Sequence, residues 1–346
     1  MRCLSKPAEL VDAPELAPRF DNIGAPPQHG APPVGVRAVL DPVLHGDTKS
    51  IILSAPNDLK SPEMDLRNCD IARKVAEQRC NRGDMDCLWY HGNWELLKSL
   101  GVVSTSGIHA AEICALLETA LSEKESTPKI LLSGSTDATL IKLLVSACRE
   151  SNCSPEITAV DICATPLEFM GQYARENMLA FSSVRADILE FNADSNYDII
   201  LTHAFMGNFD EAARVRLVRK WASMLNEGGC VVTVQRVRPE GSPPVVRFSA
   251  DQSAHFINAA LVAADAEGLQ SGDRDRVEVA AREFTENFMS HSVTSKEALN
   301  RLFLQSGLVF RHLEYRSLQT RANLGGPSVP SGGEYAFIIA ERKVSI

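Results

Sequence analysis

The feature that most constrains this chain is a regular alternation of short apolar segments and amphipathic segments between residues 129 and 237. The short segments predict buried strands, and the segments between them have the length and period of helices. Strands joined through such helices need crossover connections, which give a parallel sheet covered on both faces, an α/β fold. The predicted strands are 129–133, 156–161, 182–186, 197–202 and 230–237, and the predicted helices are 138–149, 166–177 and 210–225.

After residue 237 the alternation stops and later resumes. Residues 238–294 contain no clear strand and two helical stretches, at 254–267 and 275–291, which indicates an insertion over the site. A further helix is expected at 295–306, with Thr294 or Ser295 as its cap. Two final strands, at 308–316 and 334–342, are expected to form a hairpin at the sheet edge. In the preceding region, Gly228 and Gly229 are expected to end the helix at 210–225.

The N-terminal part has a different composition. Residues 1–64 are rich in proline, which interrupts helices, so they are expected to form an extended arm or lid, with a short strand at 50–54, or a disordered tail. Residues 65–109 are expected to form a helical cap, and a helix is expected at 108–123. Residues 110–343 then form the main domain.

Composition excludes several classes of protein. The formal net charge is −9, and no run of Lys or Arg is present, which argues against a nucleic-acid partner. None of the nine cysteines forms a C-x-x-C pair, and the tightest spacing, Cys148 to Cys153, has no nearby histidine, so we expect no metal site. An odd number of cysteines without a secretory signal favours reduced thiols and a cytoplasmic location. No apolar run is long enough for a membrane span.

The ends of the predicted strands carry the candidate ligand contacts. The first strand leads through Ser133, Gly134 and Ser135 into a helix, and such a turn can cradle a ligand against free backbone N–H groups. The second strand ends at Asp161, where a carboxylate can accept two hydrogen bonds from ribose hydroxyl groups. Asp187 follows the third strand and is placed to meet an adenine amino group. The candidate cofactor contacts are Ser133, Gly134, Ser135, Asp137, Asp161, Ile162, Asp187, Ile188, His203 and Phe205.

Four segments together resemble class I S-adenosylmethionine (SAM)-dependent methyltransferases. In chain order they are K-I-L-L-S-G-S-T-D-A, I-T-A-V-D-I-C-A-T-P-L, V-R-A-D-I-L-E-F and L-N-E-G-G-C-V-V-T-V. The resemblance implies a Rossmann-like, seven-stranded sheet with an antiparallel last strand, and SAM as cofactor. It also implies that Gly134 lies under the methionine part, Asp161 under the ribose and Asp187 near the adenine. The chain departs from the family pattern at Leu132, where an acid that helps hold the methionine ammonium group is usual.

The loop after the first strand departs from the pattern as well. The family has further glycines where this chain has Thr136 and Ala138. The amino-acid end of SAM would then be held differently, by Ser133, Ser135 or Asp137.

A cluster of aromatic residues precedes the main domain. Trp89, Tyr90, His91 and Trp94 either pack in the core of an N-terminal helix or form a wall near the cofactor, where an aromatic face attracts a sulfonium cation. The candidate catalytic residues are Tyr90, His91, Tyr173 and His203, although packing is the alternative for Tyr173.

Three functions fit these residues. The first is methyl transfer from SAM to a small molecule, such as a secondary metabolite, which needs alignment and exclusion of water more than a nucleophile. The second follows from a resemblance to azetidine-2-carboxylate synthases, in which the amine of SAM attacks its own γ-carbon and methylthioadenosine leaves; Leu132 and the aromatic cluster suit that reaction. The third is a binding protein without catalysis, which the altered glycine loop would allow.

Overall fold

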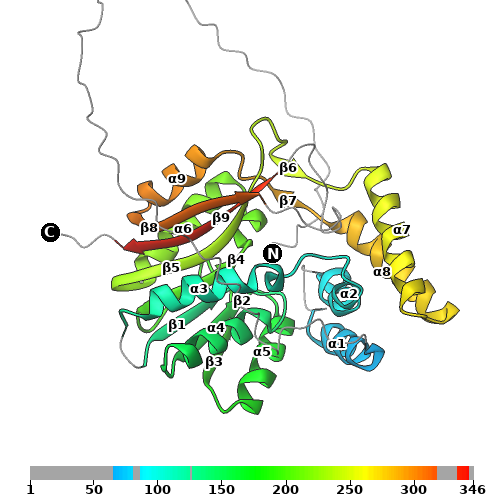
Figure 1. Cartoon of the computed structure of the whole chain (residues 1–346), viewed down its shortest axis with the longest axis horizontal. Helices are drawn as coiled ribbons and strands as arrows, with labels where there is room; N and C mark the ends of the chain where they lie inside the picture. The colour runs from blue at the N-terminus through cyan, green and yellow to red at the C-terminus, as the bar shows by residue number, and fades with distance from the viewer. Residues whose placement is uncertain (1–64, 81–85, 125–126, 318–332, 343–346) are drawn as a thin grey trace, which may run out of the picture. The chain divides into compact units, whose positions relative to one another are not determined.

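The centre of the fold is a seven-stranded sheet. The computed structural model describes residues 65–80, 86–124, 127–317 and 333–342. The strand order is β3-β2-β1-β4-β5-β9-β8 (Figure 1). The strands are β1 (Lys129–Ser133), β2 (Glu156–Asp161), β3 (Ala180–Arg185), β4 (Tyr197–His203), β5 (Leu225–Val237), β8 (Leu308–Ser317) and β9 (Glu334–Arg342).

The direction of the strands confirms the expected α/β sheet. The pairs β1–β2, β1–β4, β2–β3 and β4–β5 are parallel. Strand β9 runs antiparallel to both β5 and β8, so the last two strands form the predicted hairpin with β8 at the edge. In a parallel sheet the carboxyl ends of β1, β2, β4 and β5 meet at one edge, where crossover folds bind ligands.

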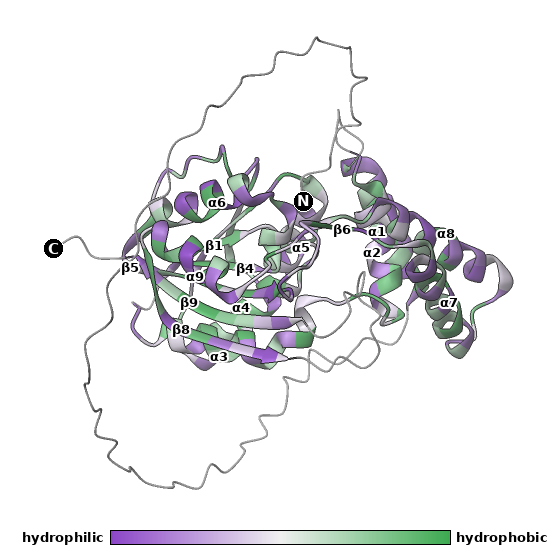
Figure 2. Cartoon of the chain, turned by 90° about the horizontal axis from the view of Figure 1, so that it is seen from above, coloured by the Kyte–Doolittle hydropathy of each residue, from purple (hydrophilic) through white to green (hydrophobic). Residues whose placement is uncertain are grey.

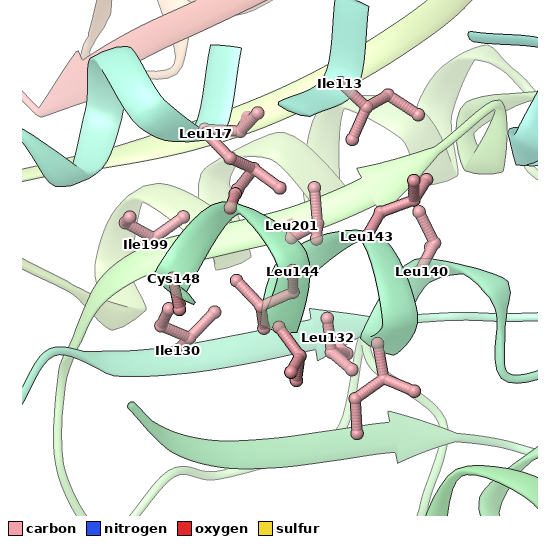
Figure 3. Close-up of a cluster of buried hydrophobic side chains, with 14 of the residues drawn as sticks. Ile113, Leu117, Ile130, Leu132, Leu140, Leu143, Leu144, Cys148, Ile199 and Leu201 are labelled. Carbon is pink, nitrogen blue, oxygen red and sulfur yellow. The ribbon is translucent and has the colours of Figure 1, made fainter. Parts of the chain in front are cut away.

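Helices cover both faces of the sheet because neighbouring residues of each strand point to opposite sides. Ile130 and Leu132 pack into a core with α3 (Ala110–Leu121), α4 (Thr139–Glu150) and α5 (Ala164–Glu176). Figure 3 shows side chains of α3, α4, β1 and β4 directed toward one another in this core. Leu131 lies on the other face.

The second face has its own apolar core. Leu131 packs there with residues of α6 (Glu211–Met224) and α9 (Lys296–Gln305). Of the two candidate caps, Ser295 caps α9, and its side chain accepts a 3.0 Å hydrogen bond from the Ala298 backbone N–H.

Two expected boundaries were wrong. Helix α6 ends at Met224, and β5 begins at the next residue, so Gly228 and Gly229 lie inside the strand and do not end the helix. The pairing of β4 with β5 shifts register near Tyr197, and Gly228 has a φ of +70°, which glycine adopts without strain. Helix α5 begins earlier than predicted, at Ala164, and Cys163 serves as its N-cap.

The predicted insertion contains two long helices, α7 (Ala250–Ala266) and α8 (Ser271–Asn287). The expectation that it contains no strand was wrong, because Val245–Val246 (β6) pairs antiparallel with Ser290–His291 (β7). This two-residue ladder was too short to produce a sequence pattern.

Helices far apart in sequence share a third core. Helix α1 (Leu66–Arg79) and α2 (Leu88–Ser99) pack with α7 and α8 around buried residues such as Phe284. Figure 2 shows hydrophilic and hydrophobic residues along both α7 and α8, as expected for helices with one buried face. The helix expected at 108–123 is the 3-10 helix η2 (Ser106–His109) followed by α3.

Some predictions concern residues that the structure does not describe. The arm assigned to residues 1–64, with its strand at 50–54, lies outside the described residues, and the domain boundaries remain predictions. Among the helices of the described ranges, none has both the length and the apolar character needed to span a bilayer.

Candidate functional site

A cavity of about 220 Å³ lies at the carboxyl edge of the parallel strands. Its walls come from the loops after β1, β2, β4 and β5, from α2, and from the segment that follows α8. Of the predicted site residues, the lining includes Tyr90, His91, Gly134, Ser135, Asp137, Asp161, Ile162, His203 and Phe205.

Gly134 forms the turn after β1. Its φ is +72°, a left-handed conformation that favours glycine. The Phe205 ring lies directly over it, since a Cβ on Gly134 would be 2.2 Å from that ring. The Phe205 ring thus fills the space next to the Gly134 Cα where the sequence predicts a close approach by a ligand, and both residues line the cavity.

Asp161 lies at the end of β2 and is buried. Its Oδ1 accepts a 2.8 Å hydrogen bond from the Cys163 N–H, and its Oδ2 accepts one of 3.1 Å from the Ser135 N–H. These bonds orient the carboxylate and join the β2 loop to the β1 loop. Burial raises the pKa of Asp161. A carboxylate offers about four acceptor positions, so the two backbone bonds leave acceptor capacity for a ligand.

Asp187 and Ile188 follow β3 and line a smaller neighbouring cavity of about 20 Å³, together with Asp161, Ile162 and Phe205. The Asp187 carboxylate accepts a 2.9 Å hydrogen bond from the Leu189 N–H. The two cavities share the wall formed by Asp161, Ile162 and Phe205.

The Asp137 carboxylate is buried and accepts three hydrogen bonds. The donors are the Thr139 N–H at 2.8 Å, Trp94 Nε1 at 3.0 Å and Lys98 Nζ at 3.2 Å. Burial acts to raise its pKa, but the positive charge of Lys98 and these hydrogen bonds lower it overall. Through these three donors Asp137 joins α2 to the β1 loop, and it also lines the cavity.

The aromatic cluster of α2 divides between two roles. Tyr90, His91 and Trp94 line the cavity, and the Tyr90 hydroxyl is 3.0 Å from Thr136 Oγ1. Tyr90 and Trp94 lie with their ring centroids 5.1 Å apart. Trp89 instead packs against Phe284 in the third core.

His203 forms a pair with His109 that the sequence did not indicate. His109 Nδ1 and His203 Nε2 are 2.9 Å apart, so the N–H of one ring must donate a hydrogen bond to the nitrogen of the other. Burial lowers the pKa of His203 to about 3 and that of His109 to about 4. Both rings are therefore neutral at pH 7, and this wall does not repel a cation.

Two predicted site residues line neither of these two cavities. The Ser133 hydroxyl accepts a 3.0 Å hydrogen bond from Trp221 Nε1 in the interior. Tyr173, on α5, is partly buried against the first core, with Lys142 Nζ 5.6 Å from its ring centroid. Neither position supports a role at the ligand.

Two arginines that the sequence did not indicate also line the cavity. Arg236 is near the end of β5 and Arg238 follows it; Arg238 is 6% exposed. Arg236 Nε and Arg238 Nη1 are buried without a hydrogen-bond partner among the described residues. Burial, followed by the charge of Arg236, lowers the pKa of Arg238 to about 10, so it stays cationic. An alternating strand sequence does not show which of its charges face a site.

Three cysteines were also missed. Cys80, Cys87 and Cys163 line the cavity, and their sulfur atoms lie within 4.8 Å of one another. They come from three different elements, so no short spacing in the sequence could reveal them.

No family model matches the chain, and no curated protein matches its sequence significantly. Solved structures with a similar arrangement include a proposed O-methyltransferase from Nostoc punctiforme, with 18% identity, TM-score 0.40 and coverage of 80% of this chain and 68% of that one. The mitomycin 7-O-methyltransferase MmcR has 14% identity and TM-score 0.39, with 68% of this chain covered; this chain spans 55% of its length. The N-methyltransferase NodS from Bradyrhizobium japonicum, in complex with S-adenosylhomocysteine, has 12% identity and TM-score 0.42, covering 72% and 99%.

This chain has a Rossmann-like fold with the seven-stranded sheet that the sequence predicted. The strand order and the antiparallel β9 carry that statement. The chemistry of the site rests on the residues of this chain alone.

Proposed function

We propose that this protein binds SAM in the 220 Å³ cavity and transfers its methyl group to a small-molecule acceptor. The observation that carries the proposal is Asp161. Its carboxylate is buried in the cavity wall at the end of β2, is oriented by two backbone N–H groups, and retains acceptor capacity for a ribose diol.

The remaining cofactor contacts follow from the order of the strands. Asp187 and Ile188, after β3, would meet the adenine beyond the ribose. The methionine part would lie over the β1 turn at Gly134, next to Phe205. Tyr90 and Trp94 would face the sulfonium, where an aromatic face contributes about 0.5–2 kcal/mol of attraction. When bound, SAM supplies a methyl group that is already activated by the positive sulfur.

The acceptor is proposed to be an anion, such as a carboxylate. Strand β5 is on the opposite side of β1 and β4 from β2, so Arg236 and Arg238 lie on the side of the cavity away from β2, and this is where we place the acceptor. Their buried, unpartnered N–H donors suit a carboxylate, which guanidinium groups bind through charged hydrogen bonds. The neutral His109–His203 pair can take up an acceptor proton only weakly, because its pKa values are low.

Cyclisation of SAM remains a second candidate. Leu132 is buried in the core, and the Asp137 carboxylate is engaged by three donors, so neither supplies a free acid for the SAM amine. An amine without such a partner loses its proton more readily and could attack the γ-carbon, with methylthioadenosine as the leaving group. Arg236 and Arg238 would then bind the carboxylate of SAM itself.

Product analysis separates these candidates. The purified full chain is incubated with SAM alone, and then with SAM and a panel of small carboxylic acids and the corresponding amides, before mass spectrometry. Methyl transfer predicts S-adenosylhomocysteine only with an acceptor, and more with the acids than with the amides. Methylthioadenosine with a four-membered amino acid from SAM alone would establish cyclisation instead. Absence of SAM binding in calorimetry would refute both and favour a protein without this activity.

A further inference from the structure

The three cavity cysteines are positioned by three separate helix ends. Cys80 follows the last residue of α1, Cys87 is the N-cap of α2, and Cys163 is the N-cap of α5. Cys163 Sγ is 3.6 Å from Cys80 Sγ and 3.5 Å from Cys87 Sγ. All three side chains are buried, and none of the three is in a disulfide bond. The packing of α1 and α2 on α5 thus concentrates three sulfur atoms in one place.

The sulfur separations fit a shared metal ion. Zinc binds thiolate sulfur at about 2.3 Å in a tetrahedron, so two thiolates on one zinc ion lie about 3.8 Å apart. A disulfide requires about 2.0 Å. The observed 3.5 Å and 3.6 Å are close to the tetrahedral edge and far from a covalent bond. Small shifts of the three cysteine side chains would bring all three sulfur atoms to bonding distance from one ion.

Among the described residues, only the three cysteines have ligand atoms that all lie within 4.8 Å of one another, so His91 is a candidate for the fourth ligand that requires a movement of its side chain. It is 5% exposed, and its Nδ1 is buried without a hydrogen-bond partner among the described residues. It lies four residues after Cys87 at the start of α2, a spacing that places two side chains on the same helix face. Both residues line the same cavity wall as Cys163. Imidazole nitrogen and thiolates are the usual donors of a structural zinc site.

We propose that Cys80, Cys87, Cys163 and the Nδ1 of His91 bind one Zn²⁺ ion. Binding releases the thiol protons and forms three Zn–S bonds and one Zn–N bond, without any redox change. The ion would tie α1 and α2 to the start of α5, two residues after Asp161. It would therefore hold the wall formed by Tyr90 and Trp94 against the Asp161 loop. This proposal replaces the expectation of no metal site, and it does not depend on the proposed methyl transfer.

Cobalt titration tests the site directly. The full chain is made metal-free under reducing conditions and titrated with Co²⁺, which reports thiolate ligands by an intense charge-transfer absorption and tetrahedral geometry by its visible bands. One equivalent of Co²⁺ should develop both signals, and one equivalent of Zn²⁺ should remove them. No charge-transfer band in the unmodified chain, with folding verified by circular dichroism, would overturn the proposal whatever the variants do.

Variants locate the ligands. Loss of even an outer-shell partner of a metal ligand costs about 10–100-fold in affinity, so Cys163→Ser and Cys87→Ser should weaken Co²⁺ binding by at least that factor. Cys153→Ser is the matched control, because Cys153 is partly exposed and outside the cluster, and it should leave the titration unchanged. His91→Ala should retain the charge-transfer band and alter the visible bands. Equal Co²⁺ affinity in Cys163→Ser and the unmodified chain would place the metal elsewhere and refute the site. SAM binding, measured separately, reports on the other proposal.

Discussion

At the scale of single residues, the site depends on polar groups whose partners come from distant parts of the chain. Asp161 is the clearest example, because Ser135 and Cys163 hold its carboxylate from two different loops. His203 is another example, since its partner His109 lies 94 residues earlier in the chain. In each case the strand end places the residue, and tertiary contacts decide its chemical state.

Replacing Asp161 tests the ribose assignment. In Asp161→Asn, an NH₂ group replaces one carboxylate oxygen and faces a backbone N–H that it cannot accept from. Fewer acceptor positions then remain for the ribose diol. A lost buried partner costs about 1–3 kcal/mol, which corresponds to about 5–150-fold weaker SAM binding by calorimetry. Asp194→Asn, on the exposed loop before β4, is the control. Unchanged SAM affinity in Asp161→Asn would exclude the ribose contact.

The histidine pair predicts a dependence of stability on pH. An unfolded histidine has a pKa near 6.5, whereas His109 and His203 have folded-state pKa values of about 4 and about 3. Between these values the unfolded chain binds protons that the folded chain does not, so the stabilisation is present above pH 6.5 and is lost as the pH falls toward 4. Urea titrations should show a shallower loss in His109→Asn than in the unmodified chain. The exposed His255→Asn should not change the slope; an equally steep loss in His109→Asn would contradict the prediction.

At the scale of elements, one arginine of α6 connects the insertion to the loop after β4 by hydrogen bonds. The Arg214 guanidinium is buried and donates to the carbonyl oxygens of Phe209 at 2.9 Å, Ser292 at 3.1 Å and Met206 at 3.3 Å. Met206 and Phe209 follow β4, and Ser292 follows β7. The residues on either side of Ser292, His291 and Val293, line the cavity. Burial lowers the pKa of Arg214, which remains cationic.

Arg214→Met is therefore expected to loosen one wall of the cavity. It leaves three buried carbonyl groups without this donor, and the free energy of unfolding should fall by about 2–4 kcal/mol. Hydrogen–deuterium exchange should increase in residues 288–293 more than in β1. The exposed Arg219→Met on the same helix should have little effect on either measurement. Exchange that rises equally in all strands would show a global rather than a local role.

At the scale of the whole molecule, the third core makes the cavity depend on segments that are far apart in sequence. Phe284 of α8 stacks on Phe256 of α7 at 5.5 Å and on Tyr90 of α2 at 6.2 Å. Tyr90 is also a cavity residue. The insertion thus supports the cavity wall through α2 in addition to the residues after α8 that line the cavity themselves.

Phe284→Ala should consequently affect both stability and ligand binding. A buried Phe→Ala change costs about 3–5 kcal/mol, measured by urea unfolding. Fluorescence of Trp89 and Trp94 should change at lower urea concentrations than circular dichroism of the sheet, and SAM affinity should decrease. Val279→Ala is the control on the same helix, because Val279 is 52% exposed. Undiminished SAM affinity in Phe284→Ala would show that SAM binding does not depend on the third core.

The sequence by itself determined the sheet and most of its covering helices. Strand β1, for example, has apolar residues on both faces, as a strand buried between two layers of helices requires. The helices around it show the helical period of apolar residues in the sequence. Asp161 and Gly134 were found for the same reason, because the carboxyl ends of parallel strands meet at one edge wherever the pattern holds.

Only the tertiary structure decided which side chains meet in the cavity. The pairing of β5 with β4 determines where α6 ends and β5 begins, whereas Gly228 and Gly229 lie inside β5. The His109–His203 pair, the two arginines and the three cysteines each combine elements or faces that no local period connects. A periodic pattern records which face of an element is buried, whereas the partner across the interface is chosen by the packing of the whole chain.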